Sequence, residues 1–278
     1  MPKLLLAFLA LIGLTLSAQA AQTIDACVKT ADNGTHGSNI ATTALLTAVG
    51  ANEVLIVFVG HDKTSGGATT VSSVTDNVTG LTYTRRGTQF TQQLGSAGTA
   101  FVAIDEFYAV TGATFSGAIS AYFAATIDNG WVVACLVTAS NTTTPFDTNV
   151  AVPATGSLLT NTSAVPTVAG VSTTCDKTMI FQVVEASSSS NLYSTPQTNG
   201  SGFAIPTNGN IAASGGTYFS DGALQYKVVA ATQSSVSTAF AVSWTGWISV
   251  TDALQDATAS CAGGGSTFHG LPLLGAGK

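Results

Sequence analysis

Short apolar runs separated by turn residues are the feature that most limits what this chain can fold into. After residue 21, no window of 12 residues repeats its apolar positions with the period of 3.6 that is typical of a helix. Thr, Val, Tyr and Phe within the runs favour strands, and Gly and Asn between them mark turns. The main runs are residues 54–59, 71–75, 81–85, 100–110, 118–124, 131–138, 179–184, 224–229, 236–244 and 247–250.

This pattern predicts an all-β protein: a two-sheet antiparallel β-sandwich of jelly-roll-like form, with long Ser-, Asn- and Gly-rich loops. The longest irregular stretches are residues 148–177 and 187–220. Trp131, Trp244 and Trp247 all stand in apolar stretches, so we expect most of them in the core. The other residues expected to be buried are Leu55, Val57, Val133, Ile180, Val183 and Val228.

The charge of the chain excludes several classes of protein. Charged side chains make up 8% of the residues, against about 25% in an ordinary soluble domain, which argues against coiled coils and charge-rich disorder. The net charge is −6. Because phosphate contacts need clustered Lys and Arg, we expect no nucleic-acid partner.

The amino terminus has the pattern of a secretory signal peptide. Lys3 precedes an apolar stretch over residues 4–16, and small residues follow at positions 17–20. The alternative is a buried amino-terminal helix. We predict a signal peptide at 1–20, a single β-sandwich domain at 21–256, and a Gly-rich linker with a short apolar tail at 257–278. No second long apolar run follows, so we expect a secreted or cell-surface protein without a membrane span.

Four cysteines remain after the signal segment: Cys27, Cys135, Cys175 and Cys261. An even number in an exported chain predicts two disulfides, with three possible pairings. Because domain ends often lie together, we expect Cys27 to pair with Cys261 and Cys135 with Cys175. Cys135 also lies within an apolar run, where the alternative is a small buried side chain with no bridge.

Residues with catalytic chemistry are few. The Gly-x-Ser-x-Gly pattern of a nucleophile elbow does not occur, and the three histidines are not spaced as zinc ligands. Asp105 and Glu106 form the only adjacent acidic pair. Neighbouring strand residues point to opposite faces, so these two carboxylates cannot easily flank one glycosidic bond. We therefore expect no catalytic residues, and keep a carbohydrate-active hydrolase as a second alternative.

We expect no cofactor, and Ca²⁺ is the ion that the sequence leaves open. The pairs Asp32–Asn33, Asp76–Asn77 and Asp128–Asn129 each place a carboxylate and an amide in a turn, although no EF-hand loop is present. Asp and Asn favour turns without any ion, which is the simpler reading. Arg85–Arg86 is the only basic cluster; it would suit an acidic glycan, or simply lie at the surface.

An ordered set of short motifs resembles a known module. The set comprises the strand at 54–60, Val-Ser-Ser-Val-Thr-Asp-Asn at 71–77, Leu-Thr-Tyr-Thr-Arg-Arg at 81–86, Phe-Tyr-Ala-Val-Thr-Gly at 107–112, the apolar run at 132–137, Ala-Ser-Asn-Thr-Thr-Thr-Pro-Phe-Asp at 139–147, Gln-Tyr-Lys-Val-Val at 225–229 and Val-Ser-Trp at 242–244. Over about residues 38–254, this order resembles a β-sandwich module found in exported bacterial proteins and in phage virion and tail proteins. Ala139–Ser140 departs from the usual Ser-Gly. The resemblance implies a jelly-roll-like sandwich with an adhesive, glycan-binding or structural role, and it supplies no catalytic residues.

The long loop at 187–220 is the expected binding surface, because a sandwich leaves recognition to loops held by its scaffold. Tyr193, Phe203, Tyr218 and Phe219 would supply aromatic contact area there, or else anchor the loop. His61 and Asp62 would begin a second loop at its rim, or form an exposed turn. These features predict a non-catalytic protein that binds a glycan or protein at a surface. The alternative is a decoration or structural protein of a virion or filament, which self-assembles or contacts virion neighbours.

Overall fold

The computed structural model describes residues 21–32, 38–42, 44–48, 50–63, 67, 69–78, 80–94, 101–112, 114–160, 162–188, 195–215 and 218–261. These residues form 18 strands and no helix, which confirms the predicted all-β class. Within the same residues, no helix is long and apolar enough to cross a membrane.

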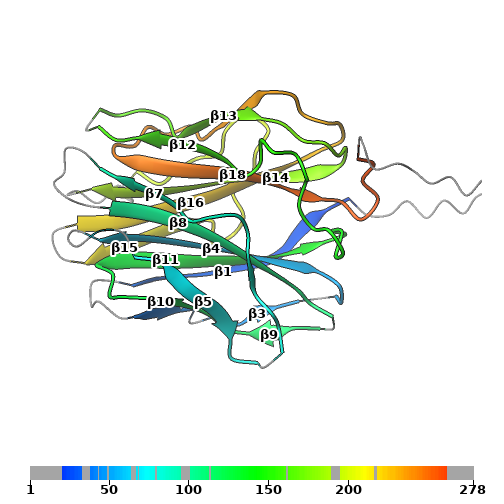
Figure 1. The fold of residues 1–278 in the computed structure, drawn as a ribbon, viewed down its shortest axis with the longest axis horizontal. Coiled ribbons are helices and arrows are strands. Elements are labelled where there is room, and N and C mark those ends of the chain that lie inside the picture. Colours follow the sequence, from blue (N-terminus) through cyan, green and yellow to red (C-terminus); the bar gives the residue numbers. More distant parts are fainter. Residues whose placement is uncertain are drawn as a thin grey trace, which may run out of the picture.

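Two large sheets form the inner layers of the fold (Figure 1). The first inner sheet has the order β1-β11-β4-β8-β6, and β7 also pairs with β8. Its strands are β1 (Thr23–Asp32), β4 (Val54–Lys63), β6 (Thr84–Arg85), β7 (Phe90–Gln93), β8 (Phe101–Val110) and β11 (Asn129–Thr138). The second inner sheet has the order β12-β18-β14-β16-β15. Its strands are β12 (Ala154–Leu158), β14 (Thr178–Ser188), β15 (Asn210–Gly215), β16 (Tyr218–Val229) and β18 (Trp247–Gln255).

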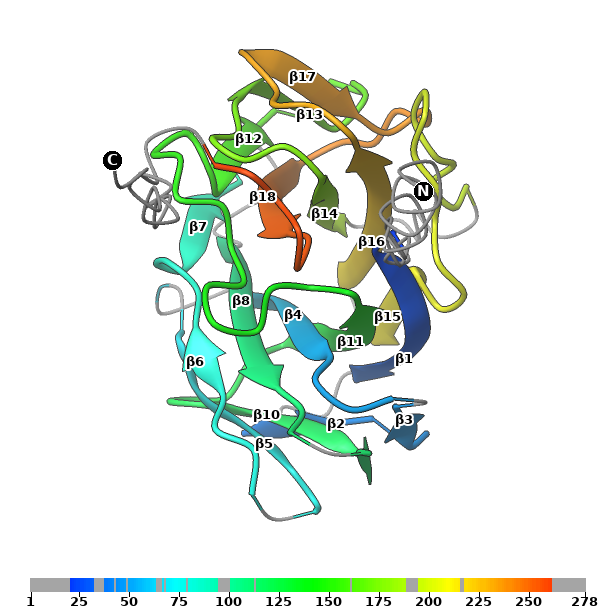
Figure 2. The same cartoon turned by 90° about the vertical axis from the view of Figure 1, so that its right-hand side faces the viewer.

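Smaller layers cover the outer faces of both inner sheets, as the views in Figures 1 and 2 agree. The outer sheet has the order β2-β10-β5 and lies on the first inner sheet, beside the short β3–β9 pair. The β13–β17 pair lies on the second inner sheet. The strands of these layers are β2 (Asn39–Ala41), β3 (Leu46–Thr47), β5 (Val71–Asp76), β9 (Ser116–Gly117), β10 (Ile119–Phe123), β13 (Thr167–Val171) and β17 (Val236–Ala239).

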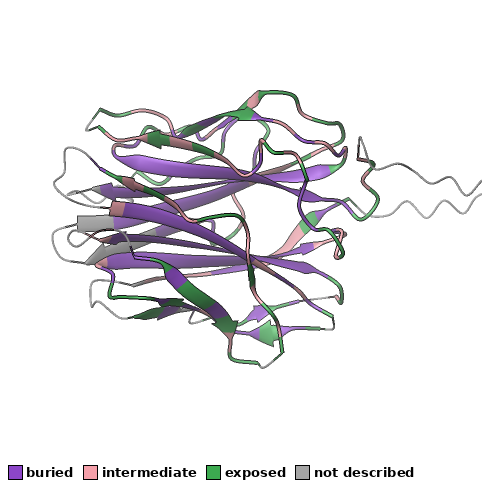
Figure 3. Cartoon of the chain, viewed as in Figure 1, coloured by how far each residue is buried: buried purple, intermediate pink, exposed green. Residues whose placement is uncertain are grey.

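Burial on both faces explains the continuous apolar runs in the sequence. Strand β4 is buried at every residue from Val54 to Asp62. Ile56 and Phe58 belong to the core between the two inner sheets, where the Phe58 and Phe181 ring centroids lie 6.4 Å apart. Leu55 and Val57 face the outer sheet instead. Figure 3 shows the same contrast: the inner strands are almost wholly buried, whereas the outer strands alternate with exposed residues. The predicted two-sheet sandwich is therefore present, with covering layers added on both sides.

One predicted core residue is exposed. Leu55, Val57, Val133, Ile180 and Val183 are buried as expected, but Val228 is 44% exposed. Strand β15 pairs with β16 only up to Ala223, so Val228 has a neighbouring strand, β14, on one side only. Two stretches predicted to be irregular also contain strands: residues 148–177 hold β12 and β13, and residues 187–220 hold β15 and the ends of β14 and β16.

The predicted disulfide pairing is wrong. Cys27 bonds to Cys135, and Cys175 bonds to Cys261. Cys27 and Cys135 are directly opposite each other in the β1–β11 ladder, with Cα atoms 4.2 Å apart. The two ends of the sandwich do lie together, since the Gln22 side chain donates a hydrogen bond to the Gln255 carbonyl at 3.0 Å. Cys261 lies six residues beyond that contact, where the chain has turned toward the segment before β14.

Trp131 fills the space between the inner sheets because two glycines lie against its ring. A Cβ atom at Gly60, its partner in the β4–β11 ladder, would be 2.1 Å from the indole Cε2. A Cβ atom at Gly222 of β16 would be 2.5 Å from the same atom. Both sheets therefore need a residue without a side chain at this point of closest approach.

We expect Gly60→Ala to lower the free energy of unfolding by about 3 kcal/mol, because the added methyl group must displace a fully buried ring. Gly112→Ala is the matched control, since nothing lies within 4 Å of the added Cβ; it should change stability by less than about 0.5 kcal/mol. Urea unfolding followed by Trp fluorescence measures both. Equal stability of the two variants would show that the ring position is not fixed by this contact.

Candidate functional site

The aromatic residues of the predicted binding loop do not form one described surface. Phe203 is 7% exposed, and the Lys227 ammonium lies 4.8 Å from the centroid of its ring. Tyr218 and Phe219 are the first residues of β16, where the structure describes their backbone and not their side chains. Tyr193 lies outside the described residues. Phe203 thus anchors its segment to the second inner sheet.

His61 and Asp62 lie inside β4, which corrects the expectation that they begin an exposed loop. The His61 ring packs edge-on against Phe123, with centroids 5.1 Å apart, and its Nε2 is 3.1 Å from the Thr69 carbonyl. Burial lowers the pKa of His61 to about 4. Strand β4 extends beyond the apolar run at 54–59 because the side chains of His61 and Asp62 have partners within the fold.

Asp62 belongs to a buried polar cluster between the inner sheets. Its Oδ1 accepts hydrogen bonds from the Asn129 backbone amide (2.9 Å) and side-chain amide (3.1 Å). Its Oδ2 accepts one from the Ser187 hydroxyl at 2.8 Å. Burial raises the pKa of Asp62 to about 6, against the lowering effect of these hydrogen bonds. Asp62 therefore joins three strands, β4, β11 and β14, at one point.

Glu185 of β14 is the second acid of this cluster. It accepts hydrogen bonds from the Trp131 indole N–H and, at 2.5 Å, from the Ser220 hydroxyl. Burial raises its pKa well above the usual range, and the nearby Asp62 carboxylate raises it further. Both oxygens of Glu185 are thus bonded to the protein itself.

Three of the turn residues considered as calcium ligands have hydrogen-bond partners within the protein. The Asp76 Oδ1 accepts from Val78 N at 2.9 Å, and the Asn77 Oδ1 accepts from Ala118 N at 2.7 Å. The Asn129 amide donates to Asp62. Asn33 lies outside the described residues. Within the part of the chain that is described, no three His, Cys, Asp or Glu side chains gather as metal ligands do.

The two arginines and the acidic pair separate onto the two faces of β8. Arg85 lies opposite Phe107 in the β6–β8 ladder and forms an ion pair with Asp105 on the face toward the outer sheet. Arg86 lies on the other face, toward the second inner sheet, where its Nε donates to the Asp252 Oδ2 at 2.8 Å. The prediction that Asp105 and Glu106 point to opposite faces fits this arrangement. The sequence shows Arg85–Arg86 and Asp105–Glu106 as adjacent pairs, but it did not predict that Arg85 pairs with Asp105 and Arg86 with Asp252.

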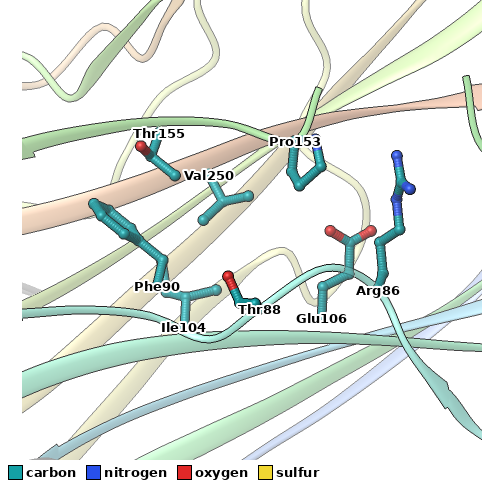
Figure 4. A pocket seen from close by; sticks show the side chains of 8 residues that line it. All are labelled: Arg86, Thr88, Phe90, Ile104, Glu106, Pro153, Thr155 and Val250. Carbon is teal, nitrogen blue, oxygen red and sulfur yellow. The ribbon is translucent and has the colours of Figure 1, made fainter. Parts of the chain in front are cut away.

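Glu106 faces a small cavity on this second face (Figure 4). The cavity lies between β8 and the start of β12, and its volume of about 30 Å³ is enough for about two water molecules. Its lining residues are Arg86, Thr88, Phe90, Ile104, Glu106, Pro153, Thr155 and Val250.

Burial is the main cause of the pKa shifts of Glu106 and of the neighbouring Asp252. Burial raises the pKa of Glu106 well above its usual range, and the Asp252 carboxylate raises it further, while the Arg86 guanidinium opposes the shift. Burial also raises the pKa of Asp252, partly offset by its hydrogen bond from Arg86. Although the two carboxyl groups lie near each other, a cavity of this volume does not admit a sugar ring between them.

No protein-family model, curated protein or solved structure matches this chain.

Asp62→Asn should flatten the dependence of stability on pH. The folded protein holds the Asp62 proton up to a pKa of about 6, against 3.8 for the ordinary group. The contribution of Asp62 to stability is therefore fully present below about pH 4, and roughly 3 kcal/mol of it is lost as the pH rises through 6. Asn keeps the shape but does not titrate, so this part of the decline should vanish.

Urea unfolding of both proteins between pH 4 and 7 measures the difference. Glu106, whose pKa is also raised, titrates in both proteins and cancels when the two curves are subtracted. The difference therefore reports Asp62 together with its electrostatic effect on Glu185, whose pKa the Asp62 carboxylate raises. Parallel curves for the two proteins would contradict the assignment.

Proposed function

We propose that the chain is an exported, non-catalytic β-sandwich that binds a neutral glycan at a surface, through the exposed face of its outer sheet. This surface, here named the outer face, consists of Asn39, Ser73, Thr75, Ser120 and Tyr122. The observation that carries the proposal is the position of Tyr122, a 40% exposed aromatic ring at the centre of three short strands.

The strand registers bring the outer face together. Tyr122 of β10 is directly opposite Asn39 of β2 and Ser73 of β5, and Ser120 is opposite Thr75. The alternate residues of β10, Ile119, Ala121 and Phe123, are buried against the first inner sheet. Since side chains alternate across a strand, the polar set and Tyr122 share the solvent side.

The chemistry of the outer face suits an uncharged sugar. The Tyr ring offers an apolar surface with a polar hydroxyl, on which the C–H face of a sugar can stack. Asn, Ser and Thr around it offer hydrogen-bond donors and acceptors. All five side chains are uncharged at neutral pH, so they supply no attraction for acidic or basic groups.

Export is supported by the cysteines and the amino terminus. Both disulfides join parts of the chain distant in sequence, and disulfides persist in oxidising compartments. The signal-like pattern over residues 1–20 points to the same compartment. Binding is favoured over catalysis because Glu106, whose carboxyl group lies near that of Asp252, faces a cavity too small for a sugar.

Tyr122→Ala should weaken binding to glycan-bearing cells or a glycan array roughly 3- to 10-fold, because one stacking ring is lost. Its free energy of unfolding should change little, since the side chain points away from the core. Val150→Ala is the control: Val150 is fully exposed in a turn before β12 and lies outside the outer face. Unchanged binding by Tyr122→Ala, with the control also unchanged, would refute this site.

A further inference from the structure

We propose that residues 268–274 of this chain dock, within their own molecule, into a groove at one corner of the sandwich. The groove, here named the corner groove, has a volume of about 300 Å³ and lies between the first part of β1 and the last part of β16. Ile24 and Cys27 of β1, Tyr226 of β16, and Ile205 and Pro206 of the loop before β15 line it. The proposal does not depend on glycan binding at the outer face.

The second inner sheet is one strand short beside the corner groove. Strand β15 pairs with β16 only up to Ala223, and the isolated bridge between Ala204 and Tyr226 is the last pairing that the described residues show on that side. Ala204 and Tyr226 exchange both backbone hydrogen bonds, at 2.8 and 2.9 Å. The N–H and C=O of Val228, two residues further on, point to the same side, where the structure describes no further strand. This edge of β16 is therefore open to one more extended segment.

The side chain of Val228 lies on the core face of β16, yet it is exposed. Leu224 belongs to the core between the inner sheets, and Tyr226 packs against that core. Because side chains alternate along a strand, Val228 lies on the same face as these two. It is directly opposite Met179, which is fully buried, but Val228 itself is 44% exposed. An apolar side chain on the core side of the sheet thus lacks a residue that covers it.

The first inner sheet also has an open edge at the groove, along β1. Cys27 and Cys135 have Cα atoms 4.2 Å apart, the short spacing of a strand pair that exchanges no backbone hydrogen bonds. The N–H and C=O of Cys27 therefore point away from β11, and the C=O accepts a hydrogen bond from the Asn208 side chain at 2.9 Å. The N–H of Cys27 points to the same open side. A docked segment can thus reach backbone groups of both inner sheets.

The chain leaves the sandwich at the same end as the groove. Cys261, the last described residue, pairs with Cys175, which precedes Thr178 by three residues. Because Thr178 is directly opposite Val229, the step from Cys261 to the open edge of β16 is roughly 10–15 Å, three strand residues and one strand spacing. Figure 2 looks onto this end of the sandwich, with β1 and β16 on one side of it. The Ala-Gly-Gly-Gly-Ser sequence at 262–266 can span up to about 17 Å, so the segment after it can reach the groove of its own molecule.

The segment carries apolar side chains at the spacing of the groove. Its sequence, Phe-His-Gly-Leu-Pro-Leu-Leu, lies outside the described residues. In an extended conformation, Leu271 and Leu273 fall on one side, two residues apart, as Tyr226 and Val228 do on β16. The two leucines would cover Val228 and bury the apolar surface that the corner leaves exposed.

Two further features of the segment agree with docking at a strand edge. If Leu271 and Leu273 direct their N–H and C=O groups at β16, the missing N–H of Pro272 points away from that strand, where proline is tolerated. Residues 262–278 contain no acidic side chain, so none is repelled by Asp25, the one charged residue that lines the groove. A tethered segment also has an effective concentration in the millimolar range, so weak docking is enough to keep it bound.

The test is residue-resolved hydrogen exchange of the full-length protein, measured by NMR. The amides of Leu271 and Leu273 should exchange at least about 10-fold more slowly than in a synthetic peptide of residues 262–278, because a millimolar effective concentration exceeds a submillimolar dissociation constant. Leu273→Asp should return the Leu271 amide to the peptide rate and should speed exchange at the N–H groups of Cys27 and Val228 by a similar factor. Ala276→Asp, outside the docked segment, is the matched control and should change none of these rates.

Val228→Asp tests the groove itself, with Val150→Asp, in the exposed turn before β12, as its control. The first variant should abolish slow exchange at Leu271, and the second should keep it. Wild-type amides of the segment that exchange at the peptide rate would overturn the proposal. If Leu273→Asp leaves the Cys27 and Val228 amides unchanged, the segment docks elsewhere and the proposal is wrong, whether or not Val228→Asp folds. Slow exchange that is lost on dilution would show that a second copy donates the segment, which contradicts docking within one molecule.

Discussion

The central strands of the two inner sheets have almost no contact with solvent, and this constraint shapes the rest of the molecule. A strand buried on both faces must be apolar along most of its length, as β4 and β11 are. Any polar side chain on such a strand must find its partner inside the protein. Most of the buried acids meet this requirement through hydrogen bonds and ion pairs. Burial also leaves room for the Trp131 ring only where two glycines face it, and it encloses the disulfide between Cys27 and Cys135.

The buried charges fix how the layers are aligned. Arg85 with Asp105 and Arg86 with Asp252 lie on opposite faces of the first inner sheet. A slip of one residue between β6 and β8 would bring each arginine to the wrong face and leave both acids unpaired. Because unpaired buried charges are far more costly than lost apolar contacts, these pairs discriminate against neighbouring registers. Burial of ion pairs is weak support for stability as such, so their effect here is on alignment.

Local sequence predicted the parts of the fold that are apolar on both sides. The runs at 54–59, 131–138 and 179–184 became β4, β11 and β14. It did not predict β12, whose residues alternate between intermediate and exposed and whose Thr, Gly and Ser have the composition of a loop. Cysteine pairing and the Arg86–Asp252 contact depend on which strands are neighbours across more than 80 residues of chain. The exposure of Val228 also depends on strand pairing, because β15 pairs with β16 only up to Ala223. The outer face depends on it as well, since the registers of three strands bring its residues together.

The outer face and the buried surroundings of Glu106 differ in how firmly the fold holds them. Phe107 and Glu106 are adjacent on β8, yet Phe107 packs beneath the outer sheet and Glu106 faces the second inner sheet. The outer sheet is half exposed and has only three short strands, so it should open locally at lower free energy than β8 does. Variants on the outer face and at Glu106 should therefore act additively on stability, because they lie on opposite sides of the first inner sheet.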